Sequence, residues 1–236
     1  MKKLTLIFTA LLFTTFAFKP ADLTLNEIIA KHIEAIGGKD NWSKVKAIHM
    51  ESTMKAQGAE IKVAITQVDK KEMRQDITLM GMTGYSIVTT TEGWSFMPFQ
   101  GQTKPEAMTA DDLKNSQDEL YIQDEFLTYT ELGKKIELFG KDDVDGTECY
   151  KIKMTDKNAQ ETTFYIDPST WYVIKQTQKI KADGKEVESS TTYGDYKKLP
   201  EGIVYPMSVV AGWGESSVTK IEINPTIDES LFKIVK

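Results

Sequence analysis

The sequence predicts an α+β protein built on one large antiparallel sheet, which a single helical segment interrupts. Segments in which apolar and polar residues alternate recur along the chain from Val45 onward, and this is the period of a half-buried strand. Turn residues separate these segments at intervals of about a dozen residues, as in a meander. Residues 108–133 lack the alternation and carry helix signals instead. A sheet this wide must curl or be covered to hide its apolar face.

The N-terminus has the features of a secretory signal peptide. Met1-Lys2-Lys3 is a short basic region, an apolar run extends from Leu4 to Phe18, and Thr15-Phe16-Ala17 offers a small–x–small cleavage site. The apolar run is shorter than the ~20 residues that a membrane-spanning helix needs. We therefore expect cleavage after Ala17, with Ala21 as the alternative. No cysteine follows the run to accept a lipid, so the product is expected to be exported, soluble and without a lipid anchor.

The domain organisation follows from these features. We expect residues 1–21 to be the signal peptide and residues 22–236 to form a single domain, in which residues 108–133 act as a helical lid.

Charge and cysteine content exclude several classes of protein. The formal net charge is −6, Arg74 is the only arginine, and there is no basic block. Nucleic acids and anionic membrane surfaces both require clustered positive charge, so we expect neither as a partner. Cys149 has no second cysteine with which to form an internal disulfide, and its strand-like neighbours Tyr150 and Ile152 favour a buried, inert thiol.

A helix is expected near the start of the mature chain. Thr24-Leu25-Asn26-Glu27 is a capping box, and Gly37-Gly38 ends the run. Apolar side chains at helical spacing form a stripe along one face of this helix. His32 lies on or beside this stripe. Because no other ligand residues lie near it, we interpret His32 as a packing residue rather than a metal ligand or a base. The stripe itself consists of Leu25, Ile28, Ile29, Ile33 and Ile36.

The interruption at residues 108–133 begins with a second capping sequence, Thr109-Ala110-Asp111-Asp112, followed by apolar residues at helical spacing. The segment is also rich in aspartate and glutamate. Because these carboxylates lack EF-hand spacing, we interpret them as a solvated outer face rather than a cation site.

Catalytic motifs are missing from the sequence. It contains no Gly-x-Ser-x-Gly elbow, no His-Glu-x-x-His and no phosphate-binding glycine loop. The two histidines, His32 and His49, lie on different expected elements. Carboxylates are abundant, which leaves a glycosidase-type pair open. We expect no enzymatic activity, no catalytic residues, no metal and no cofactor.

Methionines are concentrated in the first half of the expected sheet. The flexible thioether adapts a surface to ligands of irregular shape, and acyl chains suit such a surface because each buried CH₂ contributes ~0.8 kcal/mol. The alternative is that the methionines fill the core between the sheet and the helices, and the residues alone leave both interpretations open. The methionines in this half of the sheet are Met50, Met54, Met73, Met80, Met82 and Met97.

Five segments carry a family resemblance. They are residues 26–38 (NEIIAKHIEAIGG), 78–82 (TLMGM), 93–101 (GWSFMPFQG), 140–146 (GKDDVDG) and 224–232 (NPTIDESLF). With these segments the chain resembles the LolA-like outer-membrane lipoprotein-sorting proteins over nearly all of its mature length.

The resemblance implies an open half-barrel sheet with helices covering its concave face. It also implies a periplasmic, monomeric carrier of lipoprotein acyl chains or lipid, with an inner-membrane release complex or an outer-membrane acceptor as partners. On this basis the expected cavity floor consists of Met50, Met54, Val63, Met73, Ile77, Leu79, Trp94 and Phe96. The expected cover consists of Leu113, Leu120, Phe126 and Leu127.

This chain differs in one feature from the carriers that it resembles. They hold the lid with an arginine that is hydrogen-bonded to helix backbone, whereas strand alternation turns Arg74 away from Met73, Gln75 and Ile77. Either a bulge changes the alternation or the lid is held differently. Two other functions stay open. One is an envelope sensor that recognises lipoproteins and signals through a partner. The other is a hydrolase of envelope lipids, which would depend on a carboxylate or on His49.

Overall fold

A computed structural model describes residues 22–56, 58–182, 185–212 and 214–234. The expected signal peptide, with its cleavage positions Ala17 and Ala21, lies outside the described residues. Over the part of the chain that is described, none of the helices has the length and apolar character that crossing a bilayer requires.

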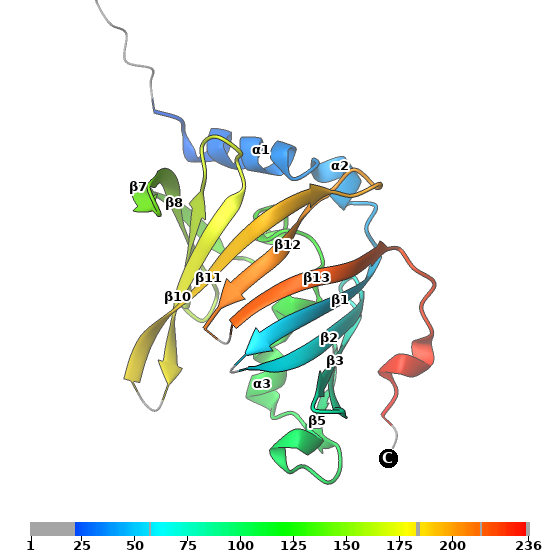
Figure 1. The fold of residues 1–236 in the computed structure, drawn as a ribbon. Coiled ribbons are helices and arrows are strands. Elements are labelled where there is room, and N and C mark those ends of the chain that lie inside the picture. Colours follow the sequence, from blue (N-terminus) through cyan, green and yellow to red (C-terminus); the bar gives the residue numbers. More distant parts are fainter. Residues whose placement is uncertain (1–21, 57, 183–184, 213, 235–236) are drawn as a thin grey trace, which may run out of the picture.

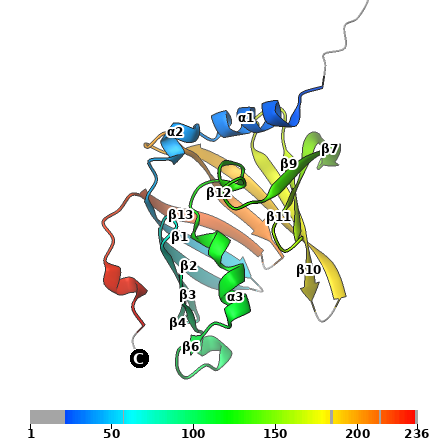
Figure 2. The same cartoon turned by 180° about the vertical axis from the view of Figure 1, so that it is seen from behind.

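The architecture is one thirteen-stranded antiparallel sheet that curves around a few short helices (Figures 1 and 2). The helical elements are α1 (Leu25–Ala35), α2 (Lys39–Trp42), η1 (Pro98–Gln100), α3 (Ala110–Asn115), η2 (Gln117–Leu120), α4 (Glu125–Thr128) and η3 (Glu229–Phe232). The first seven strands are β1 (Ala47–Ala56), β2 (Ala59–Val68), β3 (Glu72–Leu79), β4 (Met82–Thr89), β5 (Gly93–Phe96), β6 (Glu106–Ala107) and β7 (Lys135–Val144). The others are β8 (Thr147–Thr155), β9 (Glu161–Ile166), β10 (Val173–Ala182), β11 (Lys185–Lys198), β12 (Val204–Ala211) and β13 (Gly214–Ile223).

The strand order is β6-β5-β4-β3-β2-β1-β13-β12-β11-β10-β9-β8-β7. Sequence neighbours therefore pair throughout, except at the junction of β1 with β13, which joins the two arms of the sheet. Within the described residues, β6 and β7 each pair on one side, so the sheet does not close into a barrel. This arrangement confirms the predicted open half-barrel of the α+β class.

Asn224 fastens the junction between the two arms. It follows β13 with a φ of 54°, a left-handed conformation that asparagine tolerates better than most residues. Its Oδ1 accepts from the backbone N–H groups of Lys46 (2.7 Å) and Ala47 (3.2 Å), and its Nδ2 donates to the carbonyl of Lys44 (2.9 Å). The start of β1 is thereby held against the end of β13.

The N-terminal helix closes one end of the curved sheet. The predicted capping box is present, with Thr24 and Glu27 bonded to each other's backbone N–H groups. At the other end, Gly37 has a φ of 108°, and a Cβ there would lie 2.3 Å from the carbonyl oxygen of Gly202. Only glycine therefore lets the chain pass this closely over the β11–β12 turn.

Two of the three clusters of buried side chains among the described residues pack against the N-terminal helices, and the third consists of Val144, Cys149 and Tyr165. The first core cluster joins α1 and α4 to strands β8–β10 and consists of Ile28, Ile29, Phe126, Ile152, Met154, Phe164, Ile166 and Val173. The second core cluster lies around α2 and consists of Ile36, Trp42, Val45 and Ile203. Both of these clusters lie toward the α1 end of the sheet, and among the described residues no cluster of this kind includes β1–β6 side chains.

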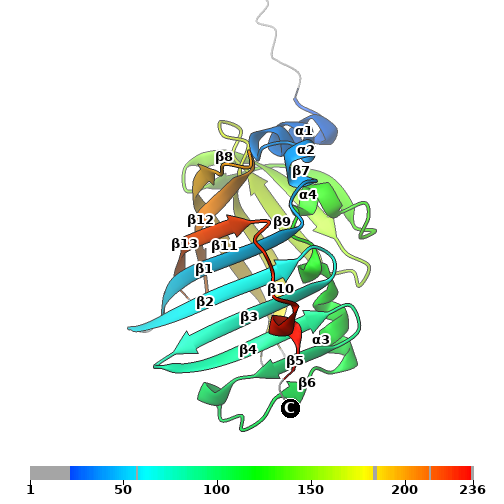
Figure 3. The ribbon, with the colours of Figure 1, turned by 90° about the vertical axis from the view of Figure 1, so that its right-hand side faces the viewer.

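The C-terminal segment crosses the convex side of the sheet, opposite to α3 (Figure 3). Arg74 donates to the carbonyl of Leu231 (2.9 Å), pairs with Asp76 (2.7 Å) and lies 4.5 Å from the ring of Tyr85. Phe232 is buried there. Arg74 thus faces away from the concave side, as strand alternation predicts, and it holds the C-terminal segment.

A substitution at Asn224 tests the junction. Asn224→Ala removes three hydrogen bonds and places an alanine at positive φ, so we expect the free energy of unfolding to fall by about 2–4 kcal/mol. Asn224→Gly keeps the conformation and loses only the hydrogen bonds, so its loss should be smaller. Urea unfolding measures both variants. Two variants as stable as the wild type would show that Asn224 does not hold the arms together.

Candidate binding site on the concave face

The concave face of β1–β3 and β13 is mostly apolar and half-buried, with Ser52, Gln67 and Gln75 among its polar residues. The register places Met50 opposite Ile65 and Ile221, and it places Met54 opposite Ile61. Val63 lies opposite Ile77. These side chains are neither fully buried nor fully exposed, so they form an accessible apolar surface. Six of the residues expected to form the floor share this face, and they are Met50, Met54, Val63, Met73, Ile77 and Leu79.

Trp94 and Phe96 do not join them. The register pairs Val88 with Gly93, so Gly93 occupies the concave position and the two aromatic residues point to the convex side. The physical reason is the closeness of the lid, because a Cβ at Gly93 would lie 2.5 Å from the sulfur of Met108. A glycine must face the lid here, and alternation turns Trp94 and Phe96 outward.

The segment expected to act as the lid has two structurally different parts. No residue of α3 is buried, and Leu113 lies against Gly93. By contrast, Leu120 and Phe126 are each 2% exposed, and Leu127 packs against the second core cluster. The buried part of the segment therefore begins at Leu120, the last residue of η2, and the part from α3 to Glu119 lies over the sheet as a less buried cover.

A glutamine on β2 attaches this cover to the sheet. Gln67 is 7% exposed and lies on the concave face opposite Met73, and its Nε2 donates to the carbonyl of Glu119 (2.7 Å). Beside it, the N–H of Lys70 donates to the carbonyl of Leu120 (2.7 Å). Gln67, and not Arg74, therefore makes this side-chain hydrogen bond from the concave face to the helical segment, and no sequence signal distinguishes this glutamine from Gln75.

The cover also reaches the opposite arm of the sheet. Nζ of Lys114 on α3 lies 3.3 Å from Oδ1 of Asn158 in the β8–β9 turn. Lys134 pairs with Asp118 (3.0 Å) and Glu125 (3.3 Å). Lys134 is 11% exposed, but Asp118 and Glu125 are 46% and 43% exposed, and ion pairs that reach solvent contribute little each to stability. The cover is thus held across the half-barrel by contacts that water can replace.

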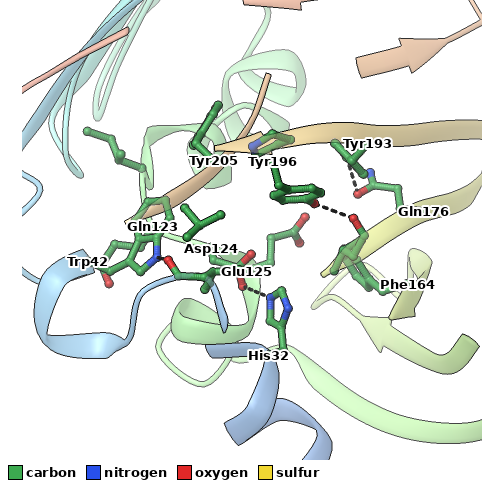
Figure 4. A pocket seen from close by; sticks show the side chains of 15 residues that line it. His32, Trp42, Gln123, Asp124, Glu125, Phe164, Gln176, Tyr193, Tyr196 and Tyr205 are labelled. Atoms are coloured by element: carbon green, nitrogen blue, oxygen red, sulfur yellow. Dashed lines mark hydrogen bonds and ion pairs between the residues drawn. The ribbon is translucent and has the colours of Figure 1, made fainter. Parts of the chain in front are cut away.

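A second site lies under α1, where a cavity of about 210 Å³ opens between the helices and β9–β12 (Figure 4). Its polar groups come from His32, Gln123, Asp124, Glu125 and Gln176. Its other lining side chains are mostly aromatic or aliphatic, and they are Ile36, Trp42, Ile122, Phe164, Val173, Tyr193, Tyr196, Val204, Tyr205 and Pro206.

His32 forms the floor of this pocket. It is 1% exposed, its Nδ1 lies 2.7 Å from the carbonyl oxygen of Trp171, and its Nε2 lies 3.4 Å from Oδ1 of Asp124. Burial lowers the pKa of His32, but the charge of Asp124 and the contact with the Trp171 carbonyl raise it more, so the net pKa lies above the ordinary value. The sequence predicts His32 as a packing residue. The structure shows it buried, and it also lines a pocket.

The remaining polar groups of the pocket are held by hydrogen bonds or charge. Burial raises the pKa of Tyr193 and Tyr196, so both hydroxyls stay protonated. Tyr193 donates to Gln176 (2.9 Å) and Tyr196 to the carbonyl of Val173 (2.6 Å). Burial also raises the pKa of Glu125. These tyrosines come from strands far from α1 in sequence, which is why sequence reasoning did not group them with His32.

The residue types that support metal binding or catalysis can be located individually. Within the described residues, no group of three or more His, Cys, Asp or Glu side chains is arranged to hold a metal ion. Cys149 is buried, and burial raises its pKa to about 11, so its thiol is protonated and inert. His49 lies on the convex side, bonded to Thr66 (2.9 Å) and 3.3 Å from Glu51.

The fold is shared with lipoprotein-sorting proteins. A LolA superfamily protein from Nitrosomonas europaea matches with a TM-score of 0.57 at 13% identity, over 90% of this chain and 99% of its own. An outer-membrane lipoprotein-sorting protein domain from Vibrio parahaemolyticus matches with a TM-score of 0.52 at 12% identity, over 87% and 94% of the two chains. A DUF1329 family protein from Desulfovibrio piger matches with a TM-score of 0.56 at 11% identity, over 89% and 97%.

These structural matches confirm the LolA-like fold that the sequence resemblance implies. No protein-family model and no curated protein matches the sequence.

The contact of Gln67 with the cover can be tested by hydrogen exchange. Gln67→Leu removes the donor to Glu119, and a net hydrogen bond contributes about 0.5–1.5 kcal/mol. We therefore expect the Lys70 amide, which donates to Leu120, to exchange about 2–10-fold faster. Gln75→Leu on the same face is the control. Equal exchange rates in Gln67→Leu and wild type would mean that Gln67 does not hold the cover.

The His32–Asp124 pair predicts a pH dependence. Folding raises the pKa of His32 above the ordinary value of 6.5, so the folded protein binds this proton more tightly than the unfolded chain. The stabilisation of the folded state by protonated His32 is complete below the ordinary pKa of 6.5, and it is lost as the pH rises through the pKa of His32 in the folded protein. Asp124→Asn keeps a helix-capping residue, so its deficit in unfolding free energy should be larger at about pH 5.5 than at about pH 9. A deficit that is constant or grows with pH would contradict the pairing.

Proposed function

We propose that this protein is an exported, non-enzymatic binding protein that carries the acyl chains of a lipoprotein or lipid on the concave face of its sheet. The single observation that carries the proposal is the accessible apolar surface of β1–β3 and β13, which lies beneath a cover attached by polar contacts. A fold shared with lipoprotein-sorting proteins supports it. On this proposal residues 1–21 direct export to the periplasm, and residues 22–236 act as one domain.

The energetics favour an extended apolar ligand. Burial of about ten CH₂ groups contributes ~8 kcal/mol, from which the costs of association are subtracted. The floor side chains suit such a chain because methionine adapts to irregular shapes, and Met50, Met54 and Met73 all lie on this face. Moving the α3–η2 cover would expose more of the same surface and would withdraw the buried Leu120, while Phe126 stays in the first core cluster.

A second candidate function rests on one exposed feature. At the tip of the β3–β4 hairpin, next to Leu79 of the floor, Met80 is 80% exposed and Met82 is 43% exposed. Met80 has a φ of 50°, a conformation that disfavours most side chains. An exposed apolar tip at the rim of the floor is typical of an interaction surface, and it favours an envelope sensor that recognises lipoproteins and signals through a partner protein.

Charge substitutions in the floor test the carrier proposal. The double variant Met54→Asp, Leu79→Asp places two carboxylates on the apolar surface, so we expect binding of an apolar fluorescent dye to weaken at least ~10-fold because burial of a charge is costly. The matched control is Thr53→Asp, Thr78→Asp, which puts the same charges at neighbouring positions on the convex side. Cooperative urea unfolding verifies that both variants fold. Dye binding that is equal in the two variants would show that the floor is not the site.

A further inference from the structure

The polar end of the pocket around His32 has an unsatisfied nitrogen. Its Nδ1 faces the carbonyl of Trp171, which can only accept, so Nδ1 carries a proton. Nε2 is buried and has no hydrogen-bond partner among the described residues. Asp124 Oδ1 lies 3.4 Å from Nε2, within ion-pair distance. It pairs with Nε2 when His32 is protonated, but when His32 is neutral both atoms are acceptors and Nε2 has no donor. Buried polar atoms without a partner are uncommon in folded proteins and call for an explanation.

The charges around this nitrogen favour a cation. Two carboxylates, those of Asp124 and Glu125, line the pocket, and among the described residues His32 is the one basic side chain of the lining. Lys134 lies outside the lining and pairs with Asp118 and Glu125. The side chain of Asp124 is 24% exposed while that of His32 is 1% exposed, so the carboxylate lies on the solvent side of the imidazole. An anionic ligand entering here would be repelled by Asp124 first.

Aromatic rings complete the surroundings. Tyr193, Tyr196, Tyr205, Trp42 and Phe164 all line the pocket. The hydroxyls of Tyr193 and Tyr196 already donate to acceptors of the protein, so these residues offer their rings rather than their O–H groups. The negative face of an aromatic ring attracts cations, and the attraction grows where water is excluded.

We propose that the pocket around His32 binds a primary ammonium group, held between Nε2 of His32 and the carboxylate of Asp124. In neutral His32 both of these groups are acceptors, and an ammonium group supplies three N–H donors to satisfy them. A quaternary ammonium group has no N–H and would leave both unsatisfied. When His32 is protonated, binding releases its Nε2 proton to solvent. The cavity of about 210 Å³ suits a headgroup or a small amine.

Two sources can supply this chemistry, a free amine or the headgroup of an aminolipid. The pocket reaches β12 and the apolar floor begins at β13, the neighbouring strand of the same sheet. The lipid source rests on the proposed carrier function, because it requires the acyl chains to lie on the floor. Binding of a free amine does not depend on the carrier function.

The first arm of the test uses ethanolamine and choline, which differ only by the methyl groups on nitrogen. The side-chain nitrogens of the full mature chain are followed by ¹⁵N NMR, with His49 on the convex side as an internal control. We expect ethanolamine to shift His32 and not His49, and choline to bind at least ~10-fold more weakly. Choline binding as tightly as ethanolamine, or no shift of His32, would overturn the proposal.

Variants assign the contact. Asp124→Asn retains helix capping at α4 and should weaken ethanolamine binding at least ~10-fold. Asp111→Asn removes the same charge from exposed α3 and should have no effect. Tyr205→Leu removes one of the aromatic rings that line the pocket without changing Asp124, which caps α4, and it should also weaken ethanolamine binding. Unchanged affinity in Asp124→Asn and Tyr205→Leu would overturn the assignment of the site.

The second arm compares lysophosphatidylethanolamine with lysophosphatidylcholine of the same acyl chain, below micelle-forming concentration. A preference of at least ~10-fold for the ethanolamine lipid, lost in Asp124→Asn, is the expected result. Equal binding of both lipids with no effect of ethanolamine on His32 would remove the ammonium site and leave the carrier function standing. A response of His32 to ethanolamine with no binding of either lipid would leave the ammonium site standing and remove the carrier function.

Discussion

The pairing of β1 with β13 is the interaction on which the rest of the structure depends. Every other pairing in the sheet joins strands that follow one another along the chain, so without this junction the two arms would be separate meanders. The junction places Met50 beside Ile221 and thus makes one continuous concave face. Asn224 secures its end through side-chain hydrogen bonds to the start of β1. Because the paired residues are far apart in sequence, their contact is costly to form in chain entropy.

The curved sheet creates two environments on one face. At the α1 end the core clusters fill the concavity and enclose a polar, aromatic pocket around His32. At the other end α3 and η2 lie over the sheet, and their contacts with it include the hydrogen bond from Gln67 to Glu119 and the approach of Leu113 to Gly93. A polar contact from Lys114 to Asn158 reaches the opposite arm. One end therefore has the packing of a permanent core and the other has that of a removable cover. This division suits a protein that opens at one end while its other end stays folded.

The sequence was sufficient for the features that depend on local patterns. The capping box at Thr24, the alternation of β1 to β3 and the outward direction of Arg74 all follow from spacing over a few residues. The concave position of Gly93 does not follow from local spacing, because it depends on how closely Met108 approaches from another segment. Trp94 and Phe96 were therefore expected on the floor, although they lie on the convex side.

Long-range contacts account for the other differences. The role of Gln67 depends on where Glu119 lies, and alternation alone gives Gln75 the same face. His32 was correctly expected to be buried, but the pocket that it lines is completed by Tyr193, Tyr196 and Tyr205, which α1 meets only in the folded sheet. No spacing rule connects residues that are separated by most of the chain.

Native mass spectrometry of the mature protein, expressed with its signal peptide in a bacterial host that has an outer membrane and purified without detergent, tests the central claim most directly. If the concave face holds acyl chains, the native mass should exceed the chain mass, and denaturation should release a lipid or an acylated peptide. The double variant Met54→Asp, Leu79→Asp should lack that excess. A wild-type mass equal to that of the bare chain would contradict the carrier function and favour an interaction module with a filled, closed half-barrel.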